Sequence, residues 1–175
     1  MKVKLTKKNT VGTGEKPYVI AEIGSNHNGD MDVAKRLIDA AKESGADCVK
    51  FQSWSTDSLY SDDFYKENPM AKRFVKKFSL DENEQEILAE YCKSVNIDFA
   101  STPYSIDEAN FLINKCKVPF IKVASMDINN YPYLRYLAKT ESAIIISSGM
   151  ANFDEITKAI KLLESEGAKN VILLH

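Results

Sequence analysis

The sequence has no strong excess of charge of either sign. It has 175 residues, with 23 lysines and arginines against 25 aspartates and glutamates, which gives a net charge of −2. A protein that binds nucleic acid or an anionic membrane surface usually carries a basic excess or a basic stretch. We therefore expect small-molecule partners, and neither nucleic acid nor a membrane.

Long hydrophobic runs are also missing. The first residues, Met1 to Leu5, include no apolar core of a signal peptide, and no later stretch approaches the ~18 apolar residues that cross a bilayer. A hydrophobic content of 44% in 175 residues is enough for one ordinary domain with a buried core. We expect a soluble, cytoplasmic protein.

Cysteine and histidine are scarce. Cys48, Cys92 and Cys116 have no CxxC spacing, so we expect reduced thiols packed as small core residues in the cytosol. His27 and His175 are the two histidines, and no HxH, HExxH or paired Cys/His motif accompanies them. No metal site can be assembled from these residues. A lone loop histidine such as His27 is more often neither a base nor a ligand.

Short apolar runs alternate with longer segments of helical period, as in β/α proteins. The expected strands are 18–23, 48–52, 98–102, 120–124, 143–147 and 171–175, and the expected helices are 31–44, 81–95, 106–115, 132–140 and 153–166. Apolar strands joined by helices predict a parallel sheet covered by helices. The length favours an open sheet at this point, because a (β/α)8 barrel has about 250 residues.

Two segments do not fit the alternation. The polar residues 1–17, with Gly12 and Gly14, predict a small hairpin or flap ahead of the main domain. The segment from Trp54 to Leu80, with Pro69 inside it, is longer than an ordinary βα loop. It is either a short extra helix or an insertion that covers a substrate, and we favour the covering insertion.

Polar residues end the predicted strands on their carboxyl side, where parallel α/β folds form active sites. They are Glu22, Lys50, Gln52, Thr102, Lys122, Ser125, Ser148 and His175. A lysine inside a parallel strand is expensive to bury unless an anion matches it. Lys50 and Lys122 together favour an anionic ligand, and the alternative is ion pairing with carboxylates such as Glu22.

Hydroxyl groups at these strand ends suit a phosphate. Ser125, Ser147 and Ser148 can donate to phosphate oxygens, and backbone N–H groups at Ser148 and Gly149 lie just before a predicted helix. Taken singly, each hydroxyl is better explained by satisfying a strand end or capping a helix, so only the cluster favours a phosphate. The aromatic residues Tyr104, Trp54 and Tyr60 either stack on a sugar or pack loops.

Several runs resemble the sialic acid synthase family. They are 21–30 (AEIGSNHNGD), 45–52 (GADCVKFQ), 101–104 (STPY), 122–125 (KVAS), 130–132 (NYP), 147–150 (SSGM) and 173–175 (LLH). The resemblance implies a (β/α)8 TIM barrel, of which residues 18–175 would supply about six βα units, truncated after strand six. It further implies a homodimer, with a small antifreeze-like domain that is absent from this chain. It also implies a divalent metal, typically manganese, whose ligands we expect beyond residue 175.

The chemistry that this family implies joins phosphoenolpyruvate to an N-acetylmannosamine-like or diacetamido-trideoxy sugar aldehyde, with the metal polarising the aldehyde. The resemblance assigns phosphoenolpyruvate to Lys50, Lys122, Ser125 and Ser148, and the sugar to Glu22, Gln52, Thr102 and Tyr104. Glu22, Lys50 and Lys122 would be catalytic and the others substrate-binding. Asp127 is a further substrate-binding candidate, at a place where some members have glutamate, and many members have phenylalanine in place of Tyr104.

The residues leave the product open among sialic, legionaminic and pseudaminic acids. Two other functions also stay open. One is a class I aldolase that forms a Schiff base through Lys50 or Lys122. The other is a barrel fragment without activity of its own that at most binds phosphate-bearing ligands.

Overall fold

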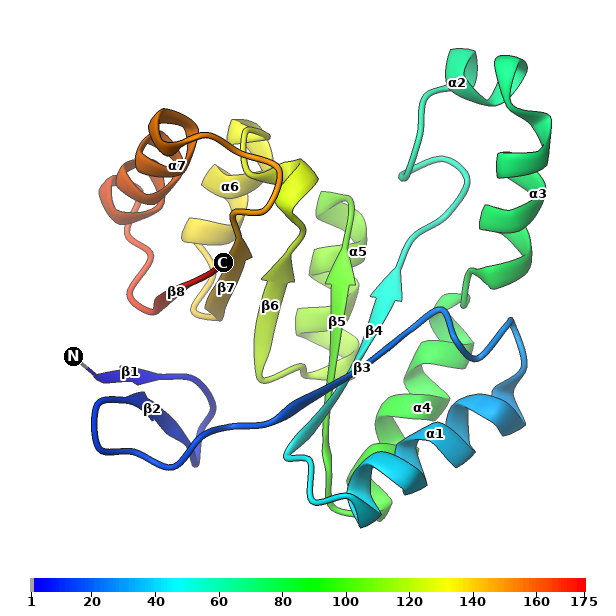
Figure 1. Cartoon of the computed structure of the whole chain (residues 1–175), viewed down its shortest axis with the longest axis horizontal. Coiled ribbons are helices and arrows are strands. Elements are labelled where there is room, and N and C mark those ends of the chain that lie inside the picture. Colours follow the sequence, from blue (N-terminus) through cyan, green and yellow to red (C-terminus); the bar gives the residue numbers. More distant parts are fainter. Residues whose placement is uncertain (1) are drawn as a thin grey trace. The chain divides into compact units, whose positions relative to one another are not determined.

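The computed structural model describes residues 2–175; Met1, the first residue of the expected 1–17 hairpin, lies outside the described residues. The chain forms two compact units (Figure 1). One comprises the described residues up to Tyr18 together with Val118–His175, and we call it the outer-segment unit. The other, Val19–Lys117, we call the middle unit.

The middle unit is built on a three-stranded parallel sheet with the order β3-β4-β5. The strands are β3 (Ile20–Gly24), β4 (Cys48–Ser53) and β5 (Asp98–Pro103). The register aligns Glu22 with Lys50 and Gln52 with Thr102, which brings the polar strand ends to one edge. The three strands confirm the predicted ones, except that the first begins at Ile20 rather than Tyr18 and ends at Gly24.

Helices α1 (Met31–Glu43) and α4 (Glu82–Ser94) lie side by side in the middle unit (Figure 1). Asp30 caps α1 by accepting from the N–H groups of the first turn. Asp81 and Glu84 form the predicted capping box at the start of α4. Between the helices, the Tyr91 hydroxyl donates to Asp39. These local signals place both helices as predicted.

The helix predicted at 106–115 is divided in the structure. Its first part is α5 (Ile106–Phe111), and its second part is a π-helix, η1 (Leu112–Cys116). The segment ends at Lys117, whose left-handed φ of 55° stops further helical turns. Sequence periodicity alone does not report this change of helical pitch.

The insertion between β4 and α4 contains two helices, α2 (Asp62–Glu67) and α3 (Pro69–Phe78), and extends beyond the carboxyl end of β4 (Figure 1). Pro69 opens α3, where its missing N–H has no intrahelical partner to lose. The insertion is therefore more helical than either of the two predictions for this segment. Its role in covering a substrate stays a prediction.

The outer-segment unit has a second parallel sheet, with the order β6-β7-β8. Its elements are β6 (Phe120–Val123), η2 (Ser125–Asp127), α6 (Tyr131–Ala138), β7 (Ala143–Ser147), α7 (Phe153–Ser165) and β8 (Val171–Leu174). These strands and helices agree with the predicted ones to within two residues. The same unit contains an antiparallel pair, β1 (Lys2–Lys4) and β2 (Thr10–Gly12).

The core of each unit is made by the strands and the inner faces of the helices. In the middle unit, Phe51 and Phe99 stack with ring centroids 5.6 Å apart. Ile38 of α1 and Leu88 of α4 are fully buried. Burying a side chain of this size contributes about 1.5–3 kcal/mol. Within residues 2–175, no helix has the length and apolar character that crossing a membrane requires.

Candidate active site

The two faces of β4 and β5 carry different chemistry, because successive side chains of a strand point to opposite sides. Lys50 and Gln52 share one face of β4, and Thr102 pairs with Gln52 on β5. Ser53 lies on the other face. The polar strand ends of the middle unit thus form one group on the face opposite to the Ser53 side.

Lys50 is the buried centre of this group. It is 8% exposed, and its ammonium forms an ion pair with the half-exposed carboxylate of Glu22. Its Nζ also donates to Thr102 Oγ1 over 3.2 Å. The predicted alternative, pairing of Lys50 with Glu22, is therefore found. The ion pair matches the buried lysine with a carboxylate that is itself half exposed to solvent.

Gln52 and Tyr104 extend the group along the same edge. Gln52 Nε2 donates to the Tyr104 hydroxyl over 3.4 Å. The Tyr104 ring meets the Trp54 indole edge-on, with centroids 5.8 Å apart. Tyr60 lies elsewhere, with its ring tilted against that of Phe64 in a separate aromatic cluster of the insertion. Of the three aromatic residues considered from the sequence, two adjoin the polar group.

Glu108 of α5 holds this arrangement together, and the sequence did not identify it. Its carboxylate accepts the Tyr104 N–H over 2.8 Å and the Ser58 hydroxyl over 2.5 Å. The spacing of Ser105 and Glu108 matches a capping box, which is the only signal the sequence offers. Ser105 does cap the helix, but the carboxylate reaches Tyr104 and the insertion loop instead of the Ser105 N–H. Glu108 therefore fixes the loop of Ser58 to the end of β5.

The reverse face of the strands carries a buried hydroxyl chain. Ser53 Oγ lies 2.6 Å from Ser101 Oγ and donates to Gln85 Oε1 of α4 over 2.5 Å. Gln85 Nε2 in turn donates to the Leu80 carbonyl. A satisfied buried chain of this kind fixes the position of α4 on the strands that carry Lys50 and Thr102.

His27 is part of the turn after β3 rather than of the polar group. It is 1% exposed, its Nδ1 accepts the Gly29 N–H over 3.1 Å, and its ring packs 5.9 Å from that of Phe51. Burial lowers the pKa of His27 below its usual value, and the nearby Glu84 carboxylate partly opposes this. The structure therefore supports the structural interpretation of this histidine.

In the outer-segment unit, the predicted site residues follow β6. Lys122 is 9% exposed, and its Nζ donates to the Val123 carbonyl over 2.7 Å. Ser125 begins the short helix η2, and its hydroxyl has no partner among the residues described. Asp127 is 9% exposed and accepts from Asn130, the residue that caps α6. Asp127 thus supports a helix start beside Ser125.

Ser148 is already engaged within its own unit. Its N–H and its hydroxyl both donate to the Leu174 carbonyl, each over 3.0 Å, and its Oγ lies 2.9 Å from His175 Nδ1. The prediction that the Ser148 N–H is free to bind a phosphate is wrong for this structure, because this N–H already donates to the Leu174 carbonyl. Ser148 looked available in the sequence because β8, whose Leu174 carbonyl accepts from it, is remote in the chain.

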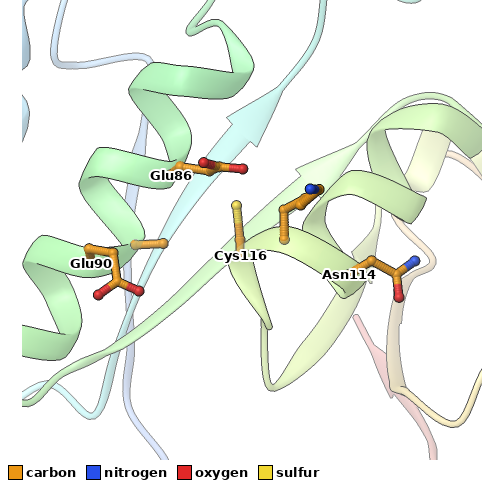
Figure 2. A pocket seen from close by; sticks show the side chains of 6 residues that line it. Glu86, Glu90, Asn114 and Cys116 are labelled. Atoms are coloured by element: carbon orange, nitrogen blue, oxygen red, sulfur yellow. The ribbon is translucent and has the colours of Figure 1, made fainter.

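The cysteines divide into two kinds. Cys48 and Cys92 are fully buried, as predicted. Cys116 is partly exposed and lines a pocket of about 270 Å³ with Glu86, Glu90 and Asn114, so the core prediction is wrong for this residue (Figure 2). Burial, together with nearby carboxylates, raises the pKa of the Cys116 thiol to about 12. The raised pKa leaves little thiolate at neutral pH, and nothing in the pocket points to a ligand.

A metal site cannot be assembled in the part of the chain that the structure describes. Residues 2–175 contain no group of three or more His, Cys, Asp or Glu side chains placed to hold an ion. The residues present do not fit the manganese ion that the family resemblance implies, and no chemical step below relies on it.

Comparison with known proteins gives consistent results. The model of the NeuB family matches residues 37–175. The N,N'-diacetyllegionaminic acid synthase of Campylobacter jejuni is 40% identical over 172 residues, which are 92% of this chain and 51% of that protein. Human N-acetylneuraminate-9-phosphate synthase is 36% identical over 162 residues, 86% of this chain and 44% of the human protein. The chain spans about half the length of the curated relatives it matches.

Solved structures agree with these matches. The crystal structure of the N-acetylneuraminic acid synthetase from Leptospira borgpetersenii, in complex with citrate, superimposes with a TM-score of 0.89 at 31% identity. It covers 100% of this chain and 59% of the Leptospira chain. The alternating β/α units match TIM-barrel synthases over about half their length, which confirms the expected barrel class. The prediction of an open sheet from the length is therefore wrong. From its motifs, its strand order and these matches, the chain belongs to the NeuB family.

Proposed function

We propose that the protein is a phosphoenolpyruvate-dependent nonulosonic acid synthase. It joins phosphoenolpyruvate to the aldehyde of an N-acylated amino sugar and releases phosphate. The observation that carries the proposal is Lys50, a buried ammonium within β4, held by Glu22 and Thr102 in a chain of the NeuB family. The names of the relatives supply the substrate class.

The lysines supply the positive charge that phosphoenolpyruvate requires. Lys50 and Lys122 are both nearly buried, and each follows the apolar run of its strand. Charge-assisted hydrogen bonds from lysine to carboxylate or phosphate are stronger than neutral ones. In the middle unit we assign Lys50 to phosphoenolpyruvate. In the outer-segment unit, the family resemblance supports Lys122 and the Ser125 hydroxyl as candidates for the same kind of anionic ligand. Ser148 joins them if its hydroxyl turns away from Leu174.

We assign the sugar to the polar group around Gln52. Glu22 is half exposed while it pairs with Lys50, so one carboxylate oxygen remains accessible to a sugar hydroxyl. Gln52, Thr102 and Tyr104 add amide and hydroxyl groups that bind hydroxyls and acyl substituents. In the outer-segment unit, Asp127 stays a proposed substrate-binding residue, and its carboxylate also accepts from Asn130 at the start of α6.

The reaction balances without any further reactant except water. C3 of phosphoenolpyruvate attacks the aldehyde carbon, a carbon–carbon bond forms, and the aldehyde oxygen takes a proton. Water adds at C2, and phosphate leaves from C2, so that a 2-keto acid remains. We assign to Glu22 the role of orienting the sugar hydroxyl or of transferring the proton to the new alkoxide, and its half-exposed carboxylate supports this assignment. We further propose that the protein is cytoplasmic, in line with its three cysteines, which form no disulfide. We also propose a homodimer, as the family resemblance implies.

Phosphate release tests the proposal. The complete reading frame that encodes this chain is expressed, and phosphate is measured from phosphoenolpyruvate with manganese and N-acetylmannosamine or a diacetamido-trideoxy hexose. We expect sugar-dependent release, and a loss of at least a hundredfold in kcat/KM for Lys50→Met. The matched control is Lys158→Met, because Lys158 is an exposed lysine on α7. Absence of release with every sugar would overturn the proposal.

Borohydride trapping separates the synthase from a Schiff-base aldolase. An ammonium held by a carboxylate, as in Lys50 with Glu22, is a poor nucleophile because imine formation requires the neutral amine. We expect no pyruvate adduct after reduction. A trapped lysine in the intact protein, found by peptide mass spectrometry, would assign the aldolase route instead.

A further inference from the structure

We propose that the indole N–H of Trp54 recognises the acyl group of the amino sugar by donating a hydrogen bond to its carbonyl oxygen. This inference rests on the proposed function and names a determinant of its specificity. Trp54 follows β4 directly, in the same unit as the sugar-side residues. Neither the strand-end motifs nor the predicted polar contacts include its N–H group.

The first argument is that Trp54 Nε1 is a buried donor without an acceptor. The atom is shielded from solvent and has no hydrogen-bond partner among the residues that the structure describes. Buried N–H groups of native proteins are nearly always paired, so an unpaired one needs an explanation. An acceptor that arrives with a ligand is one such explanation, and it requires the donor to lie beside a binding site.

The second argument is where the indole lies. Its ring is 5.8 Å from that of Tyr104, and the Tyr104 hydroxyl accepts from Gln52. The unpaired Nε1 of Trp54 is therefore part of a side chain that adjoins the sugar-side residues of the middle unit. Tyr65, another residue with an unpaired buried hydroxyl, lies instead in the insertion's own aromatic cluster with Tyr60 and Phe64.

The third argument is chemical fit. An acetamido group presents a carbonyl acceptor and a methyl group, attached to an otherwise hydroxylated sugar. The pair of Trp54 and Tyr104 offers a matching N–H donor next to apolar ring surface. An unpaired donor in an apolar setting discriminates strongly against a substrate that has no acceptor at that position, because the donor then stays unpaired. A sugar lacking the acyl group would leave Trp54 unsatisfied.

The loop that carries Trp54 is fastened at one further point. Ser58 donates to Glu108, and Glu108 also accepts the N–H of Tyr104. The tether keeps the Trp54 loop at the end of β5, while residues 55–58 are otherwise joined mainly to one another. Because Nε1 is shielded, the acyl group enters by a small shift of this loop, and the tether limits the shift.

Fluorescence provides a direct test, because Trp54 is the single tryptophan of the chain. The indole emission of the purified 175-residue chain is titrated with N-acetylmannosamine and, in parallel, with mannose, which lacks the acetamido group. We expect a saturable change in emission with N-acetylmannosamine and none with mannose. No change up to high millimolar N-acetylmannosamine, or equal changes with both sugars, overturns the inference.

Kinetics give the second readout. Trp54→Phe removes the N–H and keeps an aromatic ring, so we expect KM for N-acetylmannosamine to rise about tenfold with kcat within twofold, as for one lost hydrogen bond. The matched control is Tyr60→Phe, which removes a polar group from an aromatic residue of the same insertion. An unchanged KM in Trp54→Phe, or an equal rise in the control, rejects the role.

The two proposals fail in different ways. If no sugar supports phosphate release but the emission of Trp54 responds to the N-acyl sugar alone, the synthase proposal falls and the acyl-reading role stands. If release is sugar-dependent while the emission and the KM of Trp54→Phe do not change, the synthase stands and the role of Trp54 falls.

Discussion

Glu22 and Lys50 occupy paired positions on β3 and β4, and their side chains form an ion pair in which the two partners differ in exposure. The Lys50 side chain is 10% exposed, whereas that of Glu22 is 54% exposed. The two ends of the pair are therefore unequal in solvation. Removing the exposed partner leaves a charge in a poorly hydrated place, and removing the buried partner does not.

This inequality predicts an asymmetric effect on stability. Glu22→Gln leaves the Lys50 ammonium with its hydrogen bond to Thr102 but without a carboxylate, so we expect a loss of about 1–2 kcal/mol, reduced from the fully buried case by the exposure of Glu22. Lys50→Met leaves a carboxylate that water can reach, so we expect less than about 0.5 kcal/mol. Urea unfolding of both variants and of the double variant checks this. A larger loss for Lys50→Met would contradict the assigned burial.

The turn after β3 is sensitive at Gly29. A Cβ added there would lie 2.3 Å from the Lys77 carbonyl oxygen, and the residue has a φ of +76°. We expect Gly29→Ala to destabilise the protein by about 3 kcal/mol or more, because a steric clash adds to backbone strain.

Gly45→Ala is the matched control for this prediction. Gly45 has a φ of +84°, and a Cβ there would meet nothing within 4 Å. Strain alone predicts about 1–2 kcal/mol. Thermal unfolding of the two variants gives the comparison, and equal losses would mean that the contact between the turn and α3 is not maintained in solution.

The Glu108 tether should control the order of the Trp54 loop. Glu108→Ala removes the acceptor of two hydrogen bonds, and we expect faster limited proteolysis between residues 54 and 61 with a stability loss of about 1–2 kcal/mol. Ser58→Ala removes only the loop side of the tether. It should reproduce the increase in proteolysis with a smaller loss of stability, and an unaltered cleavage rate in both variants would argue against the tether.

Acid should destabilise the protein through His27. Its folded-state pKa lies below the ordinary value of 6.5, so below pH 6.5 the unfolded chain binds a proton that the folded chain does not. Stability therefore falls as the pH decreases through this window, until the folded-state pKa is passed. His27→Asn keeps an acceptor for the Gly29 N–H and should flatten this part of the curve. Urea unfolding between pH 5 and 7.5 measures the difference.

The thiol of Cys116 should react slowly despite its exposure. A pKa of about 12 instead of 9 leaves roughly a thousandth of the usual thiolate at pH 8, and the greater nucleophilicity of that thiolate recovers part of the rate. We expect reaction with a disulfide reagent to be on the order of 10–100 times slower than with free cysteine. Glu86→Gln should accelerate it, whereas Cys116→Ser should abolish the native-state reaction.

Local patterns in the sequence predicted the fold well. Asp30, Asp81 and Glu84 act within one turn of chain, so the starts of α1 and α4 could be identified without any tertiary information. The strands were equally visible because their apolar runs are continuous. The π-helix at Leu112–Cys116 was missed because its residues have the same composition as an ordinary helix end.

The site could be predicted only in part. Residue types and strand position identified Lys50, Gln52 and Thr102. The residues to which Lys50 and Gln52 donate hydrogen bonds, however, are remote in sequence. Leu174 takes the N–H of Ser148 from a strand 26 residues away, and Glu108 reaches Ser58 across 50 residues. Contacts of this range depend on tertiary packing, which no local pattern encodes.

The aromatic cluster of Tyr60, Phe64 and Tyr65 gives the insertion a small core of its own. Between its two ends, the segment meets the rest of the middle unit where Ser58 donates to Glu108 and where the Lys77 carbonyl lies beside Gly29. A segment with these properties can be exchanged as a cassette. If the proposed function holds, we expect that grafting residues 54–80 from a relative that uses a different sugar alters the sugar preference and leaves the strands and their lysines in place.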